Sequence, residues 1–339
     1  MNTSHKAGNT RMPNRRFIAD LKSGELIEDQ VFLIGAKDLR TTTNGSLYIH
    51  CILRDRTGQL LARQWQATEA LYHQMTEGGF GRFKGRTESF KGALQFIIDA
   101  MQPVEAADVD LSDFLPHTSQ DVDQMFARVK DILRQVRNRH LLQLIKTFVT
   151  DDALMERFRR APAAVQMHQA YLGGLLEHTL NVLELATLIL PRYPQLDSDL
   201  VLSAIFLHDI GKTTELAYET RFAYTNEGQL VGHIVQAVVW IEERSKQVEL
   251  ETGQPFPTDL KAALEHLILA HHGEHAFGSP KLPAMPEAVF IHHLDNLDAK
   301  VNIFLDKIAA DPDAESEWTQ YVHHLGTRIF KWRPPENDR

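Results

Sequence analysis

The first hundred residues alternate between apolar and polar positions over short runs, which is the period-two pattern of half-buried β-strands. Turn-forming clusters at 41–45 (Thr-Thr-Thr-Asn-Gly) and 55–58 (Asp-Arg-Thr-Gly) separate the first three runs. The expected strands are Gln30 to Leu39, Leu47 to Arg54, Leu60 to Trp65, Gly79 to Arg86 and Leu94 to Ala100. A short helix near Glu69 to Met75 divides the third strand from the fourth, and this order predicts an OB-fold barrel.

Beyond residue 120 the apolar positions change to the 3.6-residue spacing of helices. Val122 to Leu133 and His140 to Val149 show this spacing first, and we expect helices with short loops to continue to Phe330. The acidic, proline-bounded segment before them is expected to be a linker. The sequence therefore predicts an α+β protein with a disordered tail at 1–16, an OB-fold barrel at 17–104, a linker at 105–120, a helical bundle at 121–330 and a tail at 331–339.

Composition narrows the class of protein. A length of 339 residues with 43% hydrophobic residues is enough for two cores. The single cysteine, Cys51, excludes an internal disulfide framework and a thiolate-rich zinc site, so any metal must use nitrogen and oxygen ligands. No apolar run approaches the roughly 20 residues of a membrane span. We therefore expect a cytoplasmic protein without a membrane partner.

The net charge of −9 argues against a nucleic-acid partner, but its distribution reopens that possibility. Residues 1–100 carry 14 Lys and Arg against 10 Asp and Glu, or +4, which leaves −13 for the remainder. OB-fold barrels often bind single strands by stacking bases on aromatic side chains beside basic ones. The candidate nucleic-acid-binding residues are Tyr48, Arg54, Arg63, Trp65, Phe83, Lys84 and Arg86. A single aromatic in a small barrel is more often a core residue, so only the group as a whole suggests binding.

Polar residues on otherwise apolar helix faces mark the chemistry of the second half. His178 shares a face with Leu175 and Val182, and His208 follows Ala204 and Ile205. His271 and Asp295 occupy similar positions on later segments, and an ionised aspartate on an apolar face is costly unless it is paired or binds a cation. The expected metal ligands are His178, His208, Asp209, His233, His271, His272 and Asp295. A lone inward histidine is more often a satisfied core residue, so the prediction depends on the whole set.

The turn after His208 holds two further candidates. Gly211 is expected to terminate the helix, and Lys212 is placed to reach a phosphate oxygen, with a solvated lysine at a helix C-terminus as the alternative. Glu177 is a candidate for orienting a metal ligand or a water by a hydrogen bond, without touching the metal itself. With Asp209 as a bridge, two cations could share a hydroxide that attacks phosphorus in line, so Asp209 and Lys212 are the predicted catalytic residues. Manganese is the first expectation for the metal, with iron, cobalt and magnesium as alternatives.

The motifs resemble those of a known family. The order of His178, His208-Asp209 and Asp295 is similar to the HD-domain phosphohydrolases. The segments Gly-Gly-Leu-Leu-Glu-His at 173–178, His-Asp-Ile-Gly-Lys at 208–212, and His-His-Gly-Glu at 271–274 with Gly-Ser-Pro at 278–280 resemble the YhaM-type 3′→5′ exoribonucleases. The resemblance covers most of residues 17–330 and departs from the pattern at Gln169, where a second histidine would follow His168.

The resemblance implies a metal-dependent exonuclease that shortens single-stranded RNA, or also DNA, from the 3′ end to 5′-mononucleotides. It is also compatible with a homo-oligomer that encircles the strand. The absence of Gly-Tyr-Pro after His271-His272 argues against a cyclic-dinucleotide phosphodiesterase. Two alternatives stay open: an HD-domain nucleotidase or dNTP phosphohydrolase, and a non-catalytic single-strand-binding module.

Overall fold

The computed structural model describes residues 15–165, 169–313 and 315–333. The chain divides into two compact units, Met1–His117 with Ala217–Phe222, and Thr118–Leu216 with Ala223–Arg339. Among the described residues, no helix combines the length and the apolar character that a membrane span requires.

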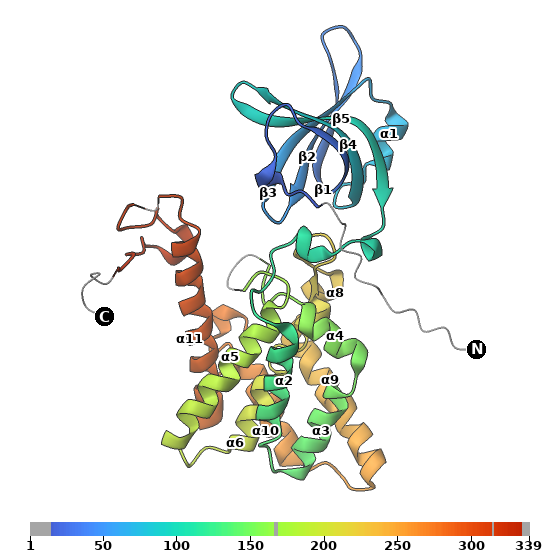
Figure 1. Ribbon diagram of the computed structural model, residues 1–339. Helices are drawn as coiled ribbons and strands as arrows, with labels where there is room; N and C mark the ends of the chain where they lie inside the picture. The colour runs from blue at the N-terminus through green and yellow to red at the C-terminus, as the bar shows by residue number, and fades with distance from the viewer. Residues whose placement is uncertain (1–14, 166–168, 314, 334–339) are drawn as a thin grey trace. The chain divides into compact units, whose positions relative to one another are not determined.

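The first unit is built on a closed five-stranded barrel with the strand order β1-β2-β3-β5-β4 (Figure 1). Its elements are β1 (Leu26–Thr41), β2 (Leu47–Asp55), β3 (Gly58–Trp65), α1 (Glu69–Gln74), β4 (Phe80–Phe90) and β5 (Ala93–Val104). The strands pair antiparallel except β3 with β5, and α1 separates β3 from β4. The OB-fold prediction is confirmed, because both the strand order and the helix position agree with it.

The barrel closes because β1 is long enough to pair with both β2 and β4. An irregularity between Ile34 and Lys37 bends the strand at Gly35, where a Cβ would lie 3.0 Å from the Ile52 carbonyl oxygen. The inward side chains form one core that includes Phe32, Phe83 and Phe96. Their burial leaves only the outward side chains free to bind a ligand.

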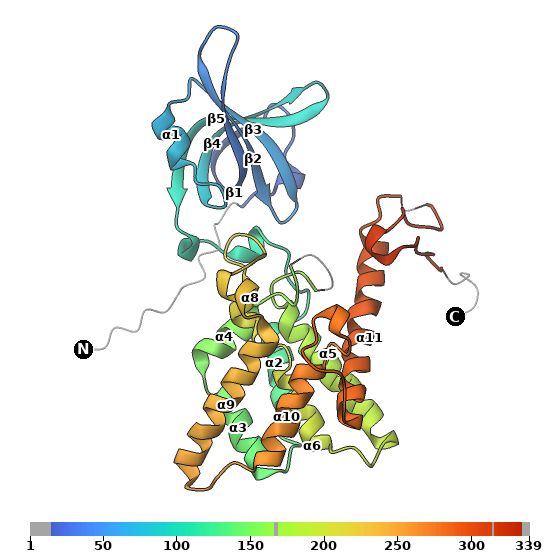
Figure 2. The same ribbon diagram turned by 180° about the vertical axis from the view of Figure 1, so that it is seen from behind.

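The second unit is a helical bundle, seen from two sides in Figures 1 and 2. Its helices are α2 (Val122–Leu133), α3 (Arg139–Val149), α4 (Asp152–Arg160), α5 (Gly174–Ile189), α6 (Ser198–Leu207), α7 (Lys212–Glu215), α8 (Asn226–Leu230), α9 (His233–Thr252), α10 (Thr258–Ala270) and α11 (Pro286–Ala309). Side-chain caps at Asp121, Asn138 and Asp197 begin α2, α3 and α6. Residues 200–207 of α6 are all buried, so this helix is the centre of the bundle.

Two parts of the predicted helical bundle differ from the sequence prediction. Residues 216–224 contain a small hairpin of β6 (Leu216–Ala217) and β7 (Ala223–Tyr224) rather than helix. The helices end at Ala309, and the following segment is held by isolated bridges, Trp318 with Phe330 and Val322 with Thr327. Pro312 and Gly326 in this segment disfavour a continuing helix.

The expected linker and tails also contain packed residues. Two short 3-10 helices lie in 105–120, and Leu111, Phe114 and Leu115 there are buried. The predicted N-terminal tail lies outside the described residues except for its last two, of which Arg15 packs its guanidinium over the Phe114 ring. In the predicted C-terminal tail, Lys331 is buried and pairs with Asp311 at 3.0 Å.

Candidate metal centre and nucleic-acid interface

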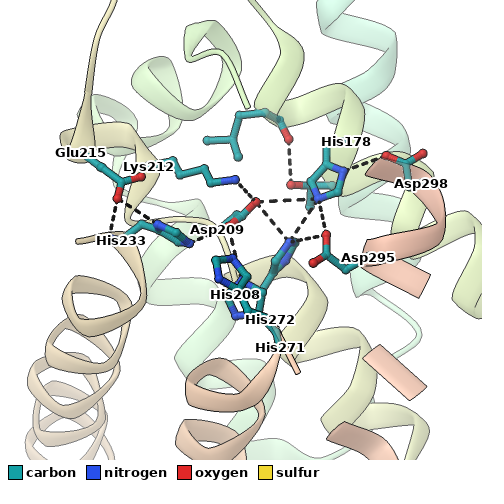
Figure 3. A network of polar contacts seen from close by, with 12 residues as sticks. His178, His208, Asp209, Lys212, Glu215, His233, His271, His272, Asp295 and Asp298 are labelled. Carbon is teal, nitrogen blue, oxygen red and sulfur yellow. Dashed lines mark hydrogen bonds and ion pairs between the residues drawn. The ribbon is translucent and has the colours of Figure 1, made fainter. Parts of the chain in front are cut away.

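Helix ends and turns bring all seven predicted metal ligands together in the bundle (Figure 3). His178 lies in α5 and Asp295 in α11, while His208 and His271 are the residues at which α6 and α10 end. His233 is the first residue of α9. The ligand atoms form two groups, each within 4.8 Å: His178, His208 and Asp295, and His233, His271 and His272.

Asp209 lies between the two groups and turns one carboxylate oxygen toward each of them. Its Oδ2 atom is 3.3 Å from His208 Nε2 and 3.7 Å from His178 Nε2. Its Oδ1 atom is 3.3 Å from His233 Nε2 and 3.7 Å from His271 Nε2. A carboxylate in this position can serve two cations at once, one through each oxygen.

The donor atoms fit divalent metal ions. Asp209 Oδ1, His233 Nε2 and His271 Nε2 are buried and have no hydrogen-bond partner. Buried polar atoms are almost always paired, because burial without a partner costs free energy. Imidazole nitrogens and carboxylate oxygens are ordinary ligands of divalent transition metals, so a cation held by His233, His271 and His272 would satisfy these three atoms.

Each imidazole of the candidate ligands makes a hydrogen bond through its Nδ1 atom, which leaves its Nε2 atom facing the centre. His208 donates from Nδ1 to the Ile205 carbonyl at 2.6 Å, and His271 donates to the Ile268 carbonyl at 2.7 Å. His272 Nδ1 bonds in the same way to the Phe277 carbonyl at 2.8 Å. Such contacts fix the tautomer and the ring orientation of metal-binding histidines.

Two carboxylates that the sequence prediction missed orient the other two histidines. Asp298 Oδ2 lies 2.7 Å from His178 Nδ1, and Glu215 Oε1 lies 3.0 Å from His233 Nδ1. Figure 3 shows them on opposite sides of the centre, each behind its histidine. Asp298 lies three residues after Asp295 on the same helix, and this spacing, which places both on one side of the helix, could have predicted its position near the ligands. Glu177 does not fill this role for His178; its carboxylate accepts a hydrogen bond from the Thr118 hydroxyl.

The electrostatics of the metal-free centre favour the protonation states that metal ligands need at Asp209 and His271, but favour the protonated form at His178. Burial alone would lower the pKa of His178, but hydrogen bonds to Asp295 and Asp298 raise it to about 10. Burial would raise the pKa of Asp209, yet the Lys212 ammonium and His208 hold it well below its usual range. Burial and the neighbouring His272 lower the pKa of His271, which keeps this imidazole neutral. Asp209 and Asp295 would offer anionic oxygens to a cation here, and His178 would have to lose a proton to bind it.

The turn between α6 and α7 differs from the expected helix end. Gly211 has right-handed helical backbone angles and is the N-cap residue of α7, so it is not a left-handed C-terminal cap. Packing requires a glycine at position 211, because a Cβ there would lie 2.2 Å from the His233 carbonyl oxygen. Lys212 Nζ donates to Asp209 Oδ2 at 2.7 Å, and 12% of the Lys212 side chain is exposed. The alternative of a solvated lysine is therefore wrong.

A pocket of about 180 Å³ opens beside the centre. Its walls are formed by Asp209, Lys212, His272, Phe277, His292, Asp295, Asn296 and Ala299. A larger cavity of about 810 Å³ lies at the opposite end of α6 and is lined by residues such as Arg134, Tyr193 and Asp199. Three of the predicted ligands, Asp209, His272 and Asp295, line the smaller pocket, and none lines the larger one.

On the barrel, aromatic and basic side chains of β2 and β3 share an outward face. The Tyr48 and Trp65 rings are neighbours across the two strands, with centroids 5.1 Å apart. The Arg63 guanidinium lies 5.8 Å from the Trp65 ring and 5.0 Å from the Phe90 ring, which the sequence prediction had not placed in the binding set. Trp65 and Phe90 are each 44% exposed. We call Tyr48, Arg63, Trp65 and Phe90 the stacking surface.

Three of the predicted nucleic-acid-binding residues lie elsewhere. Phe83 is 1% exposed and packs on Phe32 in the barrel core, so its predicted role is wrong. Lys84 pairs with Glu28 at 2.6 Å, and Arg86 pairs with Asp99 at 3.2 Å, on outward positions of β4. Arg54 is exposed on β2, on the same side of the strand as Tyr48.

Among the remaining histidines, His292 lines the pocket and its Nδ1 atom bonds to the His271 carbonyl at 2.9 Å. His266 accepts a hydrogen bond from the Ala284 backbone, and His275 bonds to the Ser279 carbonyl. His168 lies outside the described residues. The buried Gln169 beside it has a positive φ of 51°.

Comparison with known proteins finds one family model and a relative that matches most of the chain. The HD domain family model matches residues 175–300. The 3′-5′ exoribonuclease YhaM of Bacillus subtilis (strain 168) is 30% identical over 306 residues, which are 89% of this chain and 93% of that protein.

Two solved structures are similar to short parts of the chain. The second OB-fold domain of replication protein A from Methanococcus maripaludis matches with a TM-score of 0.23 and 16% identity, over 27% of this chain and 96% of that one. PriB from Ralstonia solanacearum matches with a TM-score of 0.20 and 15% identity, over 22% of this chain and 93% of that one. The identity to the Bacillus protein, which extends over nearly the whole of both chains, is decisive: this chain belongs to the YhaM-type 3′→5′ exoribonuclease family.

Proposed function

We propose that this chain removes 5′-mononucleotides one at a time from the 3′ end of single-stranded RNA, with two divalent cations held in the helical bundle. The observation that carries the proposal is the position of Asp209, whose two oxygens face two separate groups of ligand atoms. The unpartnered buried atoms Asp209 Oδ1, His233 Nε2 and His271 Nε2 support a cation in the second group, and the clustering of His178, His208 and Asp295 supports one in the first.

His178, His208 and Asp295 would hold one cation, and His233, His271 and His272 the other, with Asp209 shared. Bound cations supply Lewis-acid polarisation of the phosphate and a water of lowered pKa. The chain itself contributes the Lys212 ammonium, which lines the pocket and can neutralise charge on a phosphate oxygen. Asp298 and Glu215 keep the imidazoles of His178 and His233 in place while substrate binds and product leaves.

We propose manganese as the native metal, with iron and cobalt as the nearest alternatives. Five imidazole nitrogens favour a transition metal, while magnesium prefers oxygen ligands. Metal content of protein purified without chelators, measured by mass spectrometry, tests this assignment.

The stacking surface would hold the strand upstream of the cleaved end. Stacking of a base on an aromatic ring is sequence-tolerant, because every base has a π face. A second contact with the same strand raises the local concentration of substrate at the metal centre. Removal of residues 1–110 should therefore weaken action on long strands more than on dinucleotides, and equal loss on both would contradict this role.

The test is cleavage of 5′-labelled single-stranded RNA and DNA with added manganese. A His208→Ala, Asp209→Ala double variant removes one ligand and the bridge, and His293→Ala, at an exposed position of α11, is the matched control. A ladder that shortens from the 3′ end, absent only in the double variant, supports the proposal and gives the preferred sugar. Binding without cleavage would instead favour the nucleotidase or the binding module.

We also propose a cytoplasmic location and a homo-oligomer. Cys51 is buried in the barrel, and burial raises the pKa of its thiol to about 12, which suits a protein that forms no disulfide. Leu297, Val301 and Leu305 are exposed at successive turns of α11 and offer an apolar face to a second copy of the chain. Light scattering of the full chain and of a Val301→Glu variant tests the oligomer.

A further inference from the structure

A large aromatic ring stands exposed at the pocket beside the metal centre. Phe277 is 58% exposed, although it lines the same pocket as Asp209, Lys212 and Asp295. It lies in a 3-10 helix, His275–Phe277, that follows α10. An exposed ring at a substrate pocket is a candidate binding group, because a ring of this size is more often buried.

The turn that carries Phe277 is anchored to the metal centre. The Phe277 carbonyl accepts the hydrogen bond from His272 Nδ1, so the same residue orients a metal ligand through its backbone and exposes its ring. The neighbouring Gly278 has a φ of +84°, which a residue with a side chain adopts at a cost. Ser279 is buried, and its hydroxyl bonds to the carbonyls of Leu269 and Lys281. These contacts hold the backbone that carries the Phe277 ring beside the ligand His272.

The lining of the pocket combines charged groups with an aromatic ring. Asp209, Lys212 and Asp295 contribute the charged groups, and Phe277 contributes the ring. The charged side suits a phosphate, with Asn296 in the wall as a hydrogen-bonding partner for the sugar. The flat base of the same nucleotide matches the exposed Phe277 ring.

We propose that the Phe277 ring stacks on the 3′-terminal nucleobase of the substrate and thereby places the last phosphodiester at the metal centre. The inference rests on the proposed exoribonuclease function and adds to it a subsite for the terminal base. Stacking does not read the hydrogen-bonding edge of a base, so the subsite accepts all four bases. It rejects strands whose last nucleotide has no base.

The test combines substitution of Phe277 with removal of the 3′-terminal base from the substrate. Wild type, Phe277→Ala and Phe277→Tyr are compared on an RNA with an ordinary 3′ end and on the same RNA with an abasic 3′-terminal nucleotide. Leu282→Ala, at an exposed apolar position of the same loop, is the control. Loss of the base should lower kcat/KM of wild type by about 5- to 150-fold, chiefly through KM. Phe277→Ala should lose as much on the ordinary RNA and nothing further on the abasic RNA, while Phe277→Tyr stays near wild type.

Binding of the product and of a product that lacks the base is a second measurement, and it tests the subsite without the chemical step. Adenosine 5′-monophosphate should bind wild type more tightly than ribose 5-phosphate, and Phe277→Ala should remove the difference. Equal turnover of both RNAs by wild type, or additive effects of the two changes, would overturn the stacking proposal. Failure of wild type to shorten the ordinary RNA would refute the proposed function instead, so the two failures are distinguishable.

Discussion

Asp298→Asn should weaken metal binding without removing any metal ligand. Asp298 is buried, and its Oδ2 atom lies 2.7 Å from Nδ1 of His178. Its Oδ1 atom accepts from the side-chain amides of Asn181 and Asn302. An asparagine keeps the shape but has one oxygen where the aspartate has two, and it carries no charge. At least one donor must therefore lose its acceptor, and the His178 imidazole loses its charged partner.

The expected magnitude follows from the kind of contact that is lost. Replacing a carboxylate behind a metal-binding histidine typically costs 10- to 100-fold in metal affinity or activity. This range corresponds to about 1.4–2.7 kcal/mol, since each decade is about 1.36 kcal/mol. A hydrogen bond to a charged group contributes about 1.5–3 kcal/mol, which is consistent with that range. Burial of Asp298 means that solvent screening does not reduce the effect.

The assay is calorimetric titration of chelator-treated protein with manganese. Asp298→Asn should lower the affinity of the cation held by His178, His208 and Asp295, while Glu215→Gln should lower that of the other cation. Asp306→Asn, at an exposed position later in α11, is the matched control and should leave both affinities unchanged. Affinities of Asp298→Asn within twofold of the control would refute the orienting role of this carboxylate.

Three further predictions concern packing, strand binding and pH. Gly211→Ala should destabilise the protein by about 1–3 kcal/mol in urea unfolding and lower its metal content, because the new Cβ meets the His233 backbone, whereas Gly58→Ala has room and should not. Trp65→Ala should weaken binding of long single strands by about 5- to 150-fold in fluorescence anisotropy but leave dinucleotide cleavage unchanged, and a parallel loss on dinucleotides would contradict a strand-binding role. The pKa of His178 is raised to about 10 from 6.5, so in metal-free protein its contribution to stability is complete below pH 6.5 and is lost as the pH rises toward 10. The free energy of unfolding, measured in urea from pH 6.5 to 10, should therefore fall more steeply with pH for wild type than for His178→Gln. Equal dependence on pH in the two proteins would show that the proton on His178 does not stabilise the fold.

Much of the barrel and the ligand set could be predicted from the sequence. Strand and helix periods depend on local side-chain alternation, which is readable without a structure. The ligands stood out because a histidine or aspartate on an apolar helix face needs a partner. His178 and His208 could be named on this ground, and both are buried at the centre.

The nucleic-acid-binding surface of the barrel was predicted only in part from the local sequence pattern. Phe83 lies on the opposite face of β4 from Lys84 and Arg86, as the period of two requires, so these residues could not form one surface. Phe90 joins Trp65 around Arg63 only because the barrel brings the end of β4 beside β3. That proximity depends on sheet closure and on irregularities in strand pairing, which a single sequence does not reveal.

The sequence by itself determined most of the element types, the barrel and the seven candidate ligands, because each of these depends on local pattern or on the cost of burying a polar group. Only the tertiary structure decided that the ligands form two groups with Asp209 between them, and that Asp298 and Glu215 support the histidines. His178 and Asp298 are 120 residues apart in the chain, and their distance is set by how α5 and α11 pack. Packing of this kind sums many weak contacts over the whole bundle, and no short stretch of sequence contains it.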